Sequence, residues 1–340
     1  MPAGPASAGP QRQPWPGSSG DIEQEYRALT TACAVVDRSG RARIRHSGKD
    51  VLDLLHRLST NDLLELEAGD AAGTVLTSER GRIVDVLTVV RRAGDDLLLM
   101  SGAPSAAPAI EWIDRFTFEE DARLEDISAT TAQIAMAGPA AAGAVRRTAG
   151  ELAASLDTGR SATAEAGGAR VDIVRTDALG VPCWEIVVAA SARDAVIEAA
   201  TKAGASLARE AAWDAVRIER GVPAYGHELT DEANPLEAGL KHLVSFTKGC
   251  YVGQEVVARL DTYDKVRRAL ACLLSDAPLR PGELLSAGGQ EAGNVTSAAW
   301  SPGLRRHIGL GYVRNAFAAP GTRLLASSGP VTVAALPMVS

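Results

Sequence analysis

The sequence has few aromatic residues, few cysteines and no excess of basic residues. Phe, Trp and Tyr make up 4% of the 340 residues, whereas hydrophobic residues as a whole reach 46%. The apolar core is therefore expected to consist mainly of alanine, valine and leucine, and a ring in a polar loop becomes informative. With 35 Lys and Arg against 42 Asp and Glu, the formal net charge is −7. This balance argues against a dedicated duplex-DNA-binding protein.

The cysteines do not form a recognisable metal or redox motif. Cys33, Cys183, Cys250 and Cys272 lie far apart, and no two of them have the C-x-x-C spacing of zinc or thioredoxin-like sites. The sequence offers no ligand set for a metal, so a stably bound iron–sulfur cluster is not expected from one chain. Free thiols in a reducing cytoplasm are expected instead.

Composition divides the chain into three parts. Residues 1–20 are rich in Pro, Gly, Ala and Ser, which predicts a disordered tail rather than a signal or transit peptide. We expect residues 21–268 to form an α+β core. This core is long enough for two subdomains, each of which combines helices with an antiparallel sheet. In residues 269–340 short apolar runs alternate with Pro-Gly and Gly-Gly turns, which predicts a small β-barrel. No apolar run approaches the roughly 18 residues that span a bilayer, so a soluble, cytoplasmic protein without membrane contact is expected.

Hydrophobic periodicity and turn residues predict the main elements. A helix capped by Asp50 carries Val51, Leu54, Leu55 and Leu58 on one face, and residues 72–101 predict a β-meander. Further helices are expected over Pro108–Phe116, Ala140–Leu156, Ala192–Ala203 and Glu210–Arg220, and strands over Ala169–Arg175 and Cys183–Ala189. Asn234-Pro235-Leu236-Glu237 has the residues of a helix start, which predicts one more helix, through Leu240 and Leu243.

The segment most suggestive of chemistry is Lys248–Glu255, which reads Lys-Gly-Cys-Tyr-Val-Gly-Gln-Glu. Its two glycines let the backbone turn tightly or approach a ligand closely. Cys250 lies two residues from Lys248, a cation that would favour the reactive thiolate. A tight turn with a hydrogen-bonded polar cluster is the alternative interpretation.

This octapeptide resembles the signature of the YgfZ family of folate-binding proteins. That family includes mitochondrial iron–sulfur assembly factors and is related to the glycine-cleavage T-protein, an aminomethyltransferase. Trp213–Leu229 is similar to the R-x-E-x-G-x-x-x-Y-G segment of both groups, and Leu58–Gly69 to their T-N-D-x-x-x-L-x-x-G segment. Gly293–Ser297 and Gly309–Val313 resemble motifs of the T-protein barrel. The resemblance covers about residues 24–335 and implies a T-protein-like folate-binding core with a C-terminal barrel.

One departure concerns the catalytic aspartate of T-proteins. Their strand resembles G-G-x-x-D-D-L, with the second aspartate catalytic, whereas this chain has Asp85 followed by Val86. Because successive strand residues face opposite sides, Asp85 cannot simply replace its neighbour. Aminomethyl transfer in the T-protein manner is therefore not expected. Asp85 is either a functional acid or a hydrogen-bonded strand carboxylate.

The resemblance implies tetrahydrofolate or a derivative as the cofactor. The pterin edge presents adjacent N–H donors that one carboxylate can accept as a pair, and Glu185, preceded by Trp184, matches the pterin-binding glutamate of the related proteins. Arg217, with Arg220 one helical turn away, is expected to meet the anionic tail of the folate, although such arginines are often merely solvated. The remaining candidates for the cofactor site are Tyr225, Tyr251 and Asn61.

The resemblance also implies a function in the maturation or repair of iron–sulfur enzymes, including those that modify tRNA. Cys250, activated by Lys248, would then be a nucleophile or redox-active thiol facing the folate, and iron–sulfur proteins or their assembly factors would be partners. A folate-dependent aminomethyltransferase or demethylase and a non-catalytic folate-binding module remain alternatives, so enzymatic activity stays open. The basic stretch Arg259–Arg268 around Tyr263 predicts either a weak RNA or acidic-partner contact or, more commonly, a charged linker.

Overall fold

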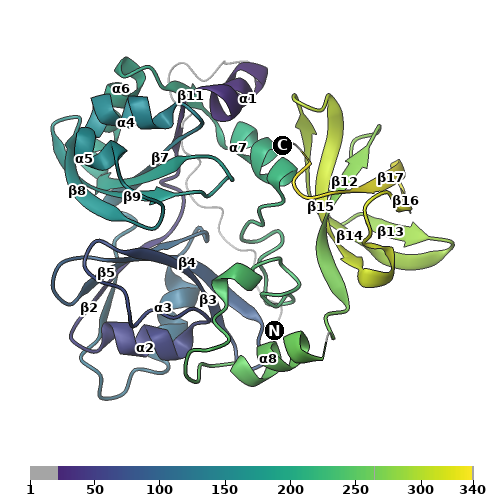
Figure 1. The fold of residues 1–340 in the computed structure, drawn as a ribbon, viewed down its shortest axis with the longest axis horizontal. Helices are drawn as coiled ribbons and strands as arrows, with labels where there is room; N and C mark the ends of the chain where they lie inside the picture. Colours follow the sequence, from purple (N-terminus) through teal and green to yellow (C-terminus); the bar gives the residue numbers. More distant parts are fainter. Residues whose placement is uncertain (1–21, 264, 339–340) are drawn as a thin grey trace, which may run out of the picture.

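Three lobes surround a common centre in the computed structural model, which describes residues 22–263 and 265–338 (Figure 1). Two lobes combine a sheet with helices, and the third is a closed β-barrel. The α+β class and the C-terminal barrel predicted from the sequence are confirmed. The predicted tail, residues 1–20, lies outside the described residues.

The first lobe is built on a six-stranded sheet. Its strands, in spatial order, are β11 (Ser206–Ala208), β1 (Ala34–Asp37), β7 (Thr131–Ala137), β10 (Cys183–Ala189), β9 (Ala169–Thr176) and β8 (Ser161–Ala166). One face packs on α4 (Ala141–Ala149), α5 (Glu151–Ala154) and α6 (Arg193–Lys202). At one end of the other face lie α1 (Ile22–Thr31) and α7 (Glu210–Arg220).

The second lobe is a five-stranded antiparallel sheet. Its order is β3 (Ala71–Thr77), β4 (Ile83–Arg91), β5 (Asp96–Ser101), β2 (Arg43–Ser47) and β6 (Arg123–Asp126). Helices α2 (Val51–Leu58) and α3 (Ala107–Asp114) bury their apolar faces against it. A small apolar cluster that includes Met100 and Val187 joins this sheet to the first one. The two sheets therefore face each other across a shared interface.

The third lobe closes on itself and has its own core. Its strands are β12 (Arg268–Ser275), β15 (Arg306–Arg314), β14 (Gln290–Ser301), β13 (Leu284–Ala287), β16 (Arg323–Ala326) and β17 (Gly329–Ala334). Helix α8 (Gln254–Thr262) precedes it, and 3-10 turns cover Ala190–Ala192, Lys241–Leu243 and Asn315–Phe317. Helix α7 lies between the first lobe and the barrel (Figure 1).

The helix predicted to begin at Asn234 does not form. The expected cap is present, because Asn234 Oδ1 accepts hydrogen bonds from the amides of Leu236 and Glu237 at 3.0 and 2.9 Å. However, Gly239 takes a φ of +75°, a left-handed conformation that ends the turn. Only the 3-10 turn at Lys241–Leu243 follows. The cap predicted from the sequence is therefore present, but the left-handed Gly239 ends the turn before a helix forms.

Two smaller expectations are also corrected. Asp50 forms no side-chain cap on α2, because its carboxylate accepts a hydrogen bond from the Asp121 amide at 2.9 Å instead. The helix expected over Ala140–Leu156 is divided into α4 and α5 by Gly150, whose φ is +91°. The meander and α7 follow the prediction closely.

His46 gives the fold a testable dependence on pH. It is fully buried in β2, and neither ring nitrogen has a hydrogen-bond partner among the described residues. Burial lowers its pKa from 6.5 to about 4. Between pH 6.5 and about 4 the unfolded chain therefore binds a proton at His46 more readily than the folded chain does. The contribution of the neutral His46 to folding stability is complete above pH 6.5 and is lost as the pH falls towards 4.

We expect the free energy of unfolding to fall more steeply between pH 6.5 and 4.5 in the wild type than in His46→Leu, by up to about 1.4 kcal/mol per pH unit. Urea unfolding at several pH values measures this slope. The exposed His227 supplies the matched control, because His227→Leu should keep the wild-type slope. Equal slopes in wild type and His46→Leu would contradict the prediction.

Candidate functional site

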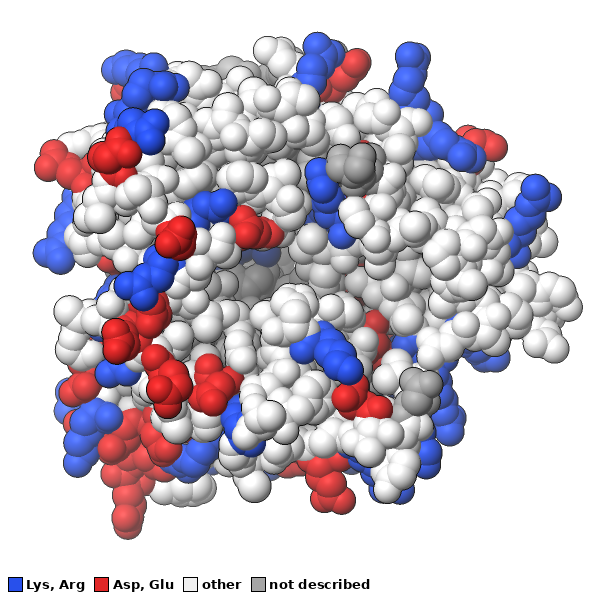
Figure 2. All heavy atoms as spheres, in the orientation of Figure 1, with Lys and Arg blue, Asp and Glu red and all other residues white. Residues whose placement is uncertain are grey.

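A cavity of about 420 Å³ lies between the sheets of the two αβ lobes. Its walls combine apolar side chains from β4 and β5 with polar side chains from β7, β9 and β10. The lining includes Arg38, Arg41, Val86, Ser101, Gln133, Arg175 and Glu185. The volume is within the range of about 300–1,000 Å³ that small-molecule sites occupy. The molecular surface is hollowed near the centre, where the lobes meet (Figure 2).

Glu185 supplies a buried carboxylate to this cavity. Its exposed fraction is 6%, and its Oε2 accepts a hydrogen bond from Gln133 Nε2 at 3.0 Å. The other carboxylate oxygen accepts no hydrogen bond from the described residues, and Gln133 Oε1 likewise has no partner there. A buried acceptor without a partner is costly, and Gln133 Oε1 is one, so this wall is suited to a ligand that carries N–H or O–H donors.

Trp184 lies on the opposite face of β10 from Glu185. It is buried in the core beneath α4, α5 and α6, its Nε1 donates to the Ala153 carbonyl at 2.8 Å, and the Arg175 guanidinium lies 4.4 Å from its ring. Strand alternation dictates this separation. The structure therefore places Trp184 behind the strand and away from the cavity, so it is not brought together with Glu185.

Val86 lines the cavity, and Asp85 is buried outside its lining. Asp85 accepts hydrogen bonds from the Ser101 hydroxyl at 2.6 Å and from the Val86 amide at 2.7 Å. Burial raises its pKa to about 6, against the lowering effect of these two bonds. Ser101 itself lines the cavity. Val86, the position to which the resemblance assigns the catalytic acid of T-proteins, is therefore an apolar part of the cavity lining, and Asp85 reaches the cavity only through the Ser101 hydroxyl.

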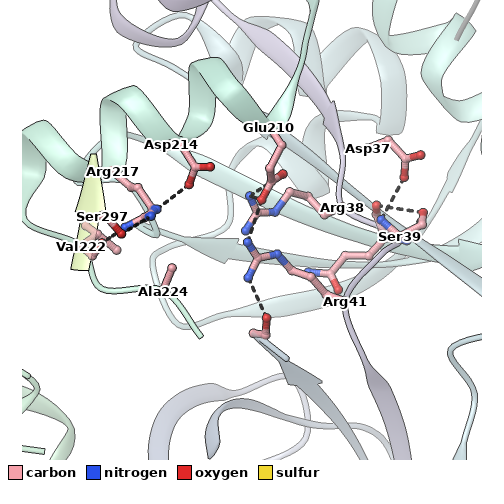
Figure 3. Close-up of polar contacts among 12 residues, drawn as sticks. Asp37, Arg38, Ser39, Arg41, Glu210, Asp214, Arg217, Val222, Ala224 and Ser297 are labelled. Carbon is pink, nitrogen blue, oxygen red and sulfur yellow. Dashed lines mark hydrogen bonds and ion pairs between the residues drawn. The ribbon is translucent and has the colours of Figure 1, made fainter. Parts of the chain in front are cut away.

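Arg217 lies away from the cavity, at the junction with the barrel (Figure 3). Its side chain is 4% exposed and is held by protein groups. The guanidinium donates to Asp214 at 2.5 Å, to Glu228 at 3.2 Å and to the Ser297 hydroxyl at 2.8 Å, and to the Val222 carbonyl at 3.3 Å. Four of its five N–H donors are therefore used within the protein, and this geometry does not favour the expected contact with an anionic tail.

The cations at the cavity that sequence reasoning missed are Arg38 and Arg41, in the connection between β1 and β2. Arg175 also lines the cavity but is bound to Asp177 and to two backbone carbonyls. The available signal was the segment Asp37-Arg38-Ser39-Gly40-Arg41, a turn with two cations directly after a buried strand.

Lys248 is a helix cap rather than a neighbour of the thiol. Its buried ammonium donates to the carbonyls of His56, Ser59 and Asn61 at 2.5, 2.8 and 2.7 Å. Burial lowers its pKa to about 8. These carbonyls belong to the C-terminal end of α2 and the turn after it, where a cation is stabilising. All three protons of the ammonium are thus used, and no proton remains to be shared with Cys250.

Cys250 is exposed and is not part of the cavity lining. Three residues on, Gly253 has a φ of +84°, and a Cβ there would lie 2.4 Å from the Ser78 carbonyl oxygen. Glycine is therefore required at 253, whereas Gly249 faces open space. Between them, Tyr251 is buried with its pKa raised to about 12 by burial. Residues 248–253 form a loop that is anchored by Lys248 at one end and by Gly253 at the other, and it presents the Cys250 thiol at the surface directly before α8.

Asn61 and Tyr225 lie next to the cavity without lining it. Asn61 Nδ2 donates to the carbonyl of Gly73, a lining residue, at 2.8 Å. Tyr225 lies in the loop after α7, close to Gly102. Burial, with the charges of Asp85 and Asp231, raises its pKa. Both residues shape the walls of the cavity.

The basic stretch Arg259–Arg268 is divided between a surface and a junction. Arg268 donates to the Glu232 carbonyl at 2.7 Å and pairs with Glu237 at 3.3 Å, so it ties the core to the barrel. Arg259 is exposed beside Lys265, whose ammonium lies 5.3 Å from the Tyr263 ring. Asp264 lies outside the described residues. An RNA or acidic-partner contact stays a prediction.

Within residues 22–263 and 265–338, no group of three or more His, Cys, Asp or Glu side chains could hold a metal ion. Over the same residues no helix has the length and apolar character needed to cross a membrane.

Known proteins resemble this chain over most of its length. Residues 10–248 match the family model of the GCVT N-terminal domain, and residues 267–339 match that of the glycine cleavage T-protein C-terminal barrel domain. An aminomethyltransferase of Geobacillus kaustophilus is 33% identical over 316 residues, covering 88% of this chain and 84% of the relative. One of Thermus thermophilus is 30% identical over 324 residues, covering 94% and 90%.

Among solved structures, the glycine cleavage system aminomethyltransferase T from Bartonella henselae superimposes with a TM-score of 0.83 at 22% identity. The match covers 94% of this chain and 89% of that chain. At this level of identity the likeness concerns the fold, and it confirms the T-protein-like architecture expected from the sequence.

The assignment of Arg217 to the barrel junction can be tested by stability. Arg217→Ala leaves the fully buried Glu228 carboxylate without its cation, so we expect a loss of about 3–5 kcal/mol in the free energy of unfolding. Arg146→Ala is the control, because it removes only the exposed ion pair with Glu151, and it should change stability by less than about 1 kcal/mol. An Arg217→Ala protein of unchanged stability would refute the assignment.

Proposed function

Because the chain belongs to the glycine-cleavage T-protein family, we propose that it is a tetrahydrofolate-binding protein of the YgfZ type. Its role is to assist the maturation or repair of iron–sulfur enzymes, those that modify tRNA among them. The observation that carries the folate assignment is the buried Glu185 carboxylate, which faces a cavity of about 420 Å³ with one oxygen free of protein partners. The iron–sulfur role rests on the resemblance of Lys248–Glu255 to the YgfZ signature.

The residues at the cavity fit a reduced folate. Glu185 can accept the paired N–H groups of a pterin edge, and Gln133 Oε1 adds a buried acceptor without a partner. Val86, Leu87 and Met100 line the cavity and offer apolar cover for the faces of the ring. Arg38 and Arg41 supply positive charge for the carboxylates of the tail.

Each residue has a defined task in this proposal. Tetrahydrofolate, when bound, supplies a carrier for one-carbon groups. Glu185 binds and orients the pterin, and Gln133 holds the Glu185 carboxylate through the 3.0 Å hydrogen bond. The two facing sheets exclude water from the ring. The Ser101 hydroxyl, itself bonded to Asp85, can hold a proton at the opposite wall.

The apolar side chain of Val86 argues against aminomethyl transfer in the T-protein manner. Proton transfer at that wall of the cavity needs an acid or base within hydrogen-bond reach of the substrate. Val86 lines the cavity where T-proteins carry the acid, and Asp85 is buried outside the lining. The proposed protein therefore keeps the ability to bind folate without that transfer chemistry.

Cys250 is proposed to act on a partner protein rather than on the folate. Its thiol is exposed and is not part of the cavity lining. The loop that carries it is fixed at both ends, by the Lys248 cap on α2 and by Gly253 against the turn at Ser78. A rigid, exposed thiol suits contact with an iron–sulfur protein or assembly factor, because little order has to be gained on docking.

The folate assignment predicts that Glu185→Gln binds 5-formyltetrahydrofolate about 10- to 100-fold more weakly than the wild type, because hydrogen bonds to a charged acceptor contribute about 1.5–3 kcal/mol. Isothermal titration measures both dissociation constants. Glu165→Gln, an exposed change on β8 of the same sheet, should bind like the wild type. A wild type that does not bind, or a Glu185→Gln protein with unchanged affinity, would remove the central claim.

The role of the thiol predicts a different pattern for Cys250→Ala. Its folate affinity should stay within about twofold of the wild type, since Cys250 is not part of the cavity lining. Cells that depend on this variant should lose activity of iron–sulfur enzymes, measured on cell extracts. Thr247→Ala, an exposed change in the same loop, is the control. Full activity with Cys250→Ala would favour the non-catalytic folate-binding module.

A further inference from the structure

A cavity of about 560 Å³ lies farther along the interface between the two αβ lobes, beside the turn that joins β4 and β5. The described residues that line it all differ from those that line the cavity at Glu185. A backbone joint stands between the two cavities, where the Ala71 amide donates to the Gly159 carbonyl and the Ser161 amide to the Gly69 carbonyl, both at 2.7 Å. Ala71 and Gly159 line the first cavity, whereas Gly69 and Ser161 line this one.

Both lobes contribute arginines to this cavity. Arg91 ends β4 of the second lobe and Arg92 follows it, whereas Arg170 lies on β9 of the first lobe. Arg170 shares a strand face with Asp172, and that face is turned towards the second lobe, because Asp172 accepts a hydrogen bond from Arg92. Thr163 of β8, the cross-strand neighbour of Asp172, lines the same wall. We call this space the arginine cavity.

Arg92 is a link between the lobes. Its Nη2 donates to Asp172 of the first lobe, and its Nη1 lies 3.5 Å from an oxygen of Asp96 in the second lobe. Asp96 in turn accepts a hydrogen bond from Arg45 at 2.8 Å. The two cations and two anions of these contacts balance one another, so they add no net charge to the arginine cavity.

Arg91 and Arg170 carry the charge that the protein leaves unbalanced. The Arg91 side chain donates to the Leu66 carbonyl at 2.5 Å and forms no ion pair with a described residue. The exposed Arg170 side chain has no hydrogen bond or ion pair within the described part of the chain. Glu165 lies opposite Arg170 in the strand register, but the two are not paired. Two positive charges, one from each lobe, therefore border a single cavity, which attracts an anion.

We infer that the arginine cavity binds a phosphate monoester of a small polyhydroxylated molecule, such as a sugar. A phosphate group offers three acceptor oxygens, so it can bind guanidinium groups on two opposite walls at once, whereas a carboxylate matches a single guanidinium fork. Arg91 and Arg170 would hold the phosphate. The carboxylates of Asp96 and Asp172 retain lone pairs that can accept hydrogen bonds from the hydroxyl groups of the ligand.

The rest of the lining favours a ligand without a nucleobase. The described residues that line the arginine cavity include no aromatic side chain, so a base would find no ring on which to stack. The volume of about 560 Å³ is within the range of small-molecule sites. The inference does not depend on the folate assignment, because the two cavities are lined by different residues.

Isothermal titration of the full chain with glucose 6-phosphate and with glycerol 3-phosphate tests the inference. We expect the wild type to bind both esters and Arg170→Ala to bind them about tenfold more weakly, because one charge-assisted contact is lost. Arg170→Lys keeps the charge without the forked geometry and should recover part of the affinity. Thermal melting verifies that each variant is folded.

The controls separate the phosphate from the rest of the ligand. Arg323→Ala removes an exposed arginine of the barrel strand β16 that lines neither cavity, and it should bind like the wild type. Glucose, which lacks the phosphate, should not bind. Inorganic phosphate, which lacks the hydroxyl-bearing carbon chain, should bind more weakly than glucose 6-phosphate.

The inference is overturned if neither ester binds the wild type, if Arg170→Ala binds as tightly as the wild type, or if inorganic phosphate binds as tightly as glucose 6-phosphate. A second titration in saturating 5-formyltetrahydrofolate locates the ligand. Affinity for the esters should be unchanged there, whereas a loss of binding would place them in the cavity at Glu185 and also overturn the inference. A protein that binds the esters but no folate would refute the folate assignment alone.

Discussion

The buried ion pair between Arg217 and Glu228 is the interaction on which the arrangement of the lobes depends. Glu228 is fully buried and also accepts hydrogen bonds from the Ala224 amide and from two hydroxyl groups of the barrel strand β14. Two residues after Arg217, Glu219 accepts from Tyr26 of α1 and Ser301 of β14. A buried carboxylate is tolerated only with such a set of donors. Helix α7 therefore fixes the barrel against the first lobe.

Charged groups in this protein fall into two kinds, according to whether the chain itself satisfies them. Lys248 donates all three of its protons to carbonyls, and Arg217 donates to four protein groups, so they act as structural cations. Glu185 retains a free oxygen at a cavity, and Arg38 and Arg41 are met by a single half-exposed carboxylate. Hydrogen-bonding capacity that folding leaves unused marks the candidate site better than charge alone.

The sequence predicted the elements that periodicity governs, such as α2, α7 and the meander of β3, β4 and β5, and the resemblance led to Glu185. It could not place residues whose contacts depend on a partner distant in the chain. Arg217 looked available because Glu228 and Ser297 come together with it only in the folded chain. Trp184 and Glu185 were placed in one site, although the alternation of a strand separates them. The sequence shows which residues carry charged or reactive groups, whereas the tertiary structure determines which of these groups lack a partner within the protein.

That alternation also separates binding from catalysis in this fold. Glu185 stands on β10 of the first sheet, whereas the acid of T-proteins aligns with Val86 on β4 of the second sheet. A carboxylate at position 85 instead of 86 lies buried outside the cavity, where it accepts a hydrogen bond from Ser101. This difference on β4 leaves the wall that carries Glu185 unchanged. Because the two walls come from different sheets, one can lose its reactive group without disturbing the other. A protein of this architecture can therefore keep the cavity wall that carries Glu185 while its reactive group lies elsewhere, and the proposed function assigns that part to the exposed thiol of Cys250.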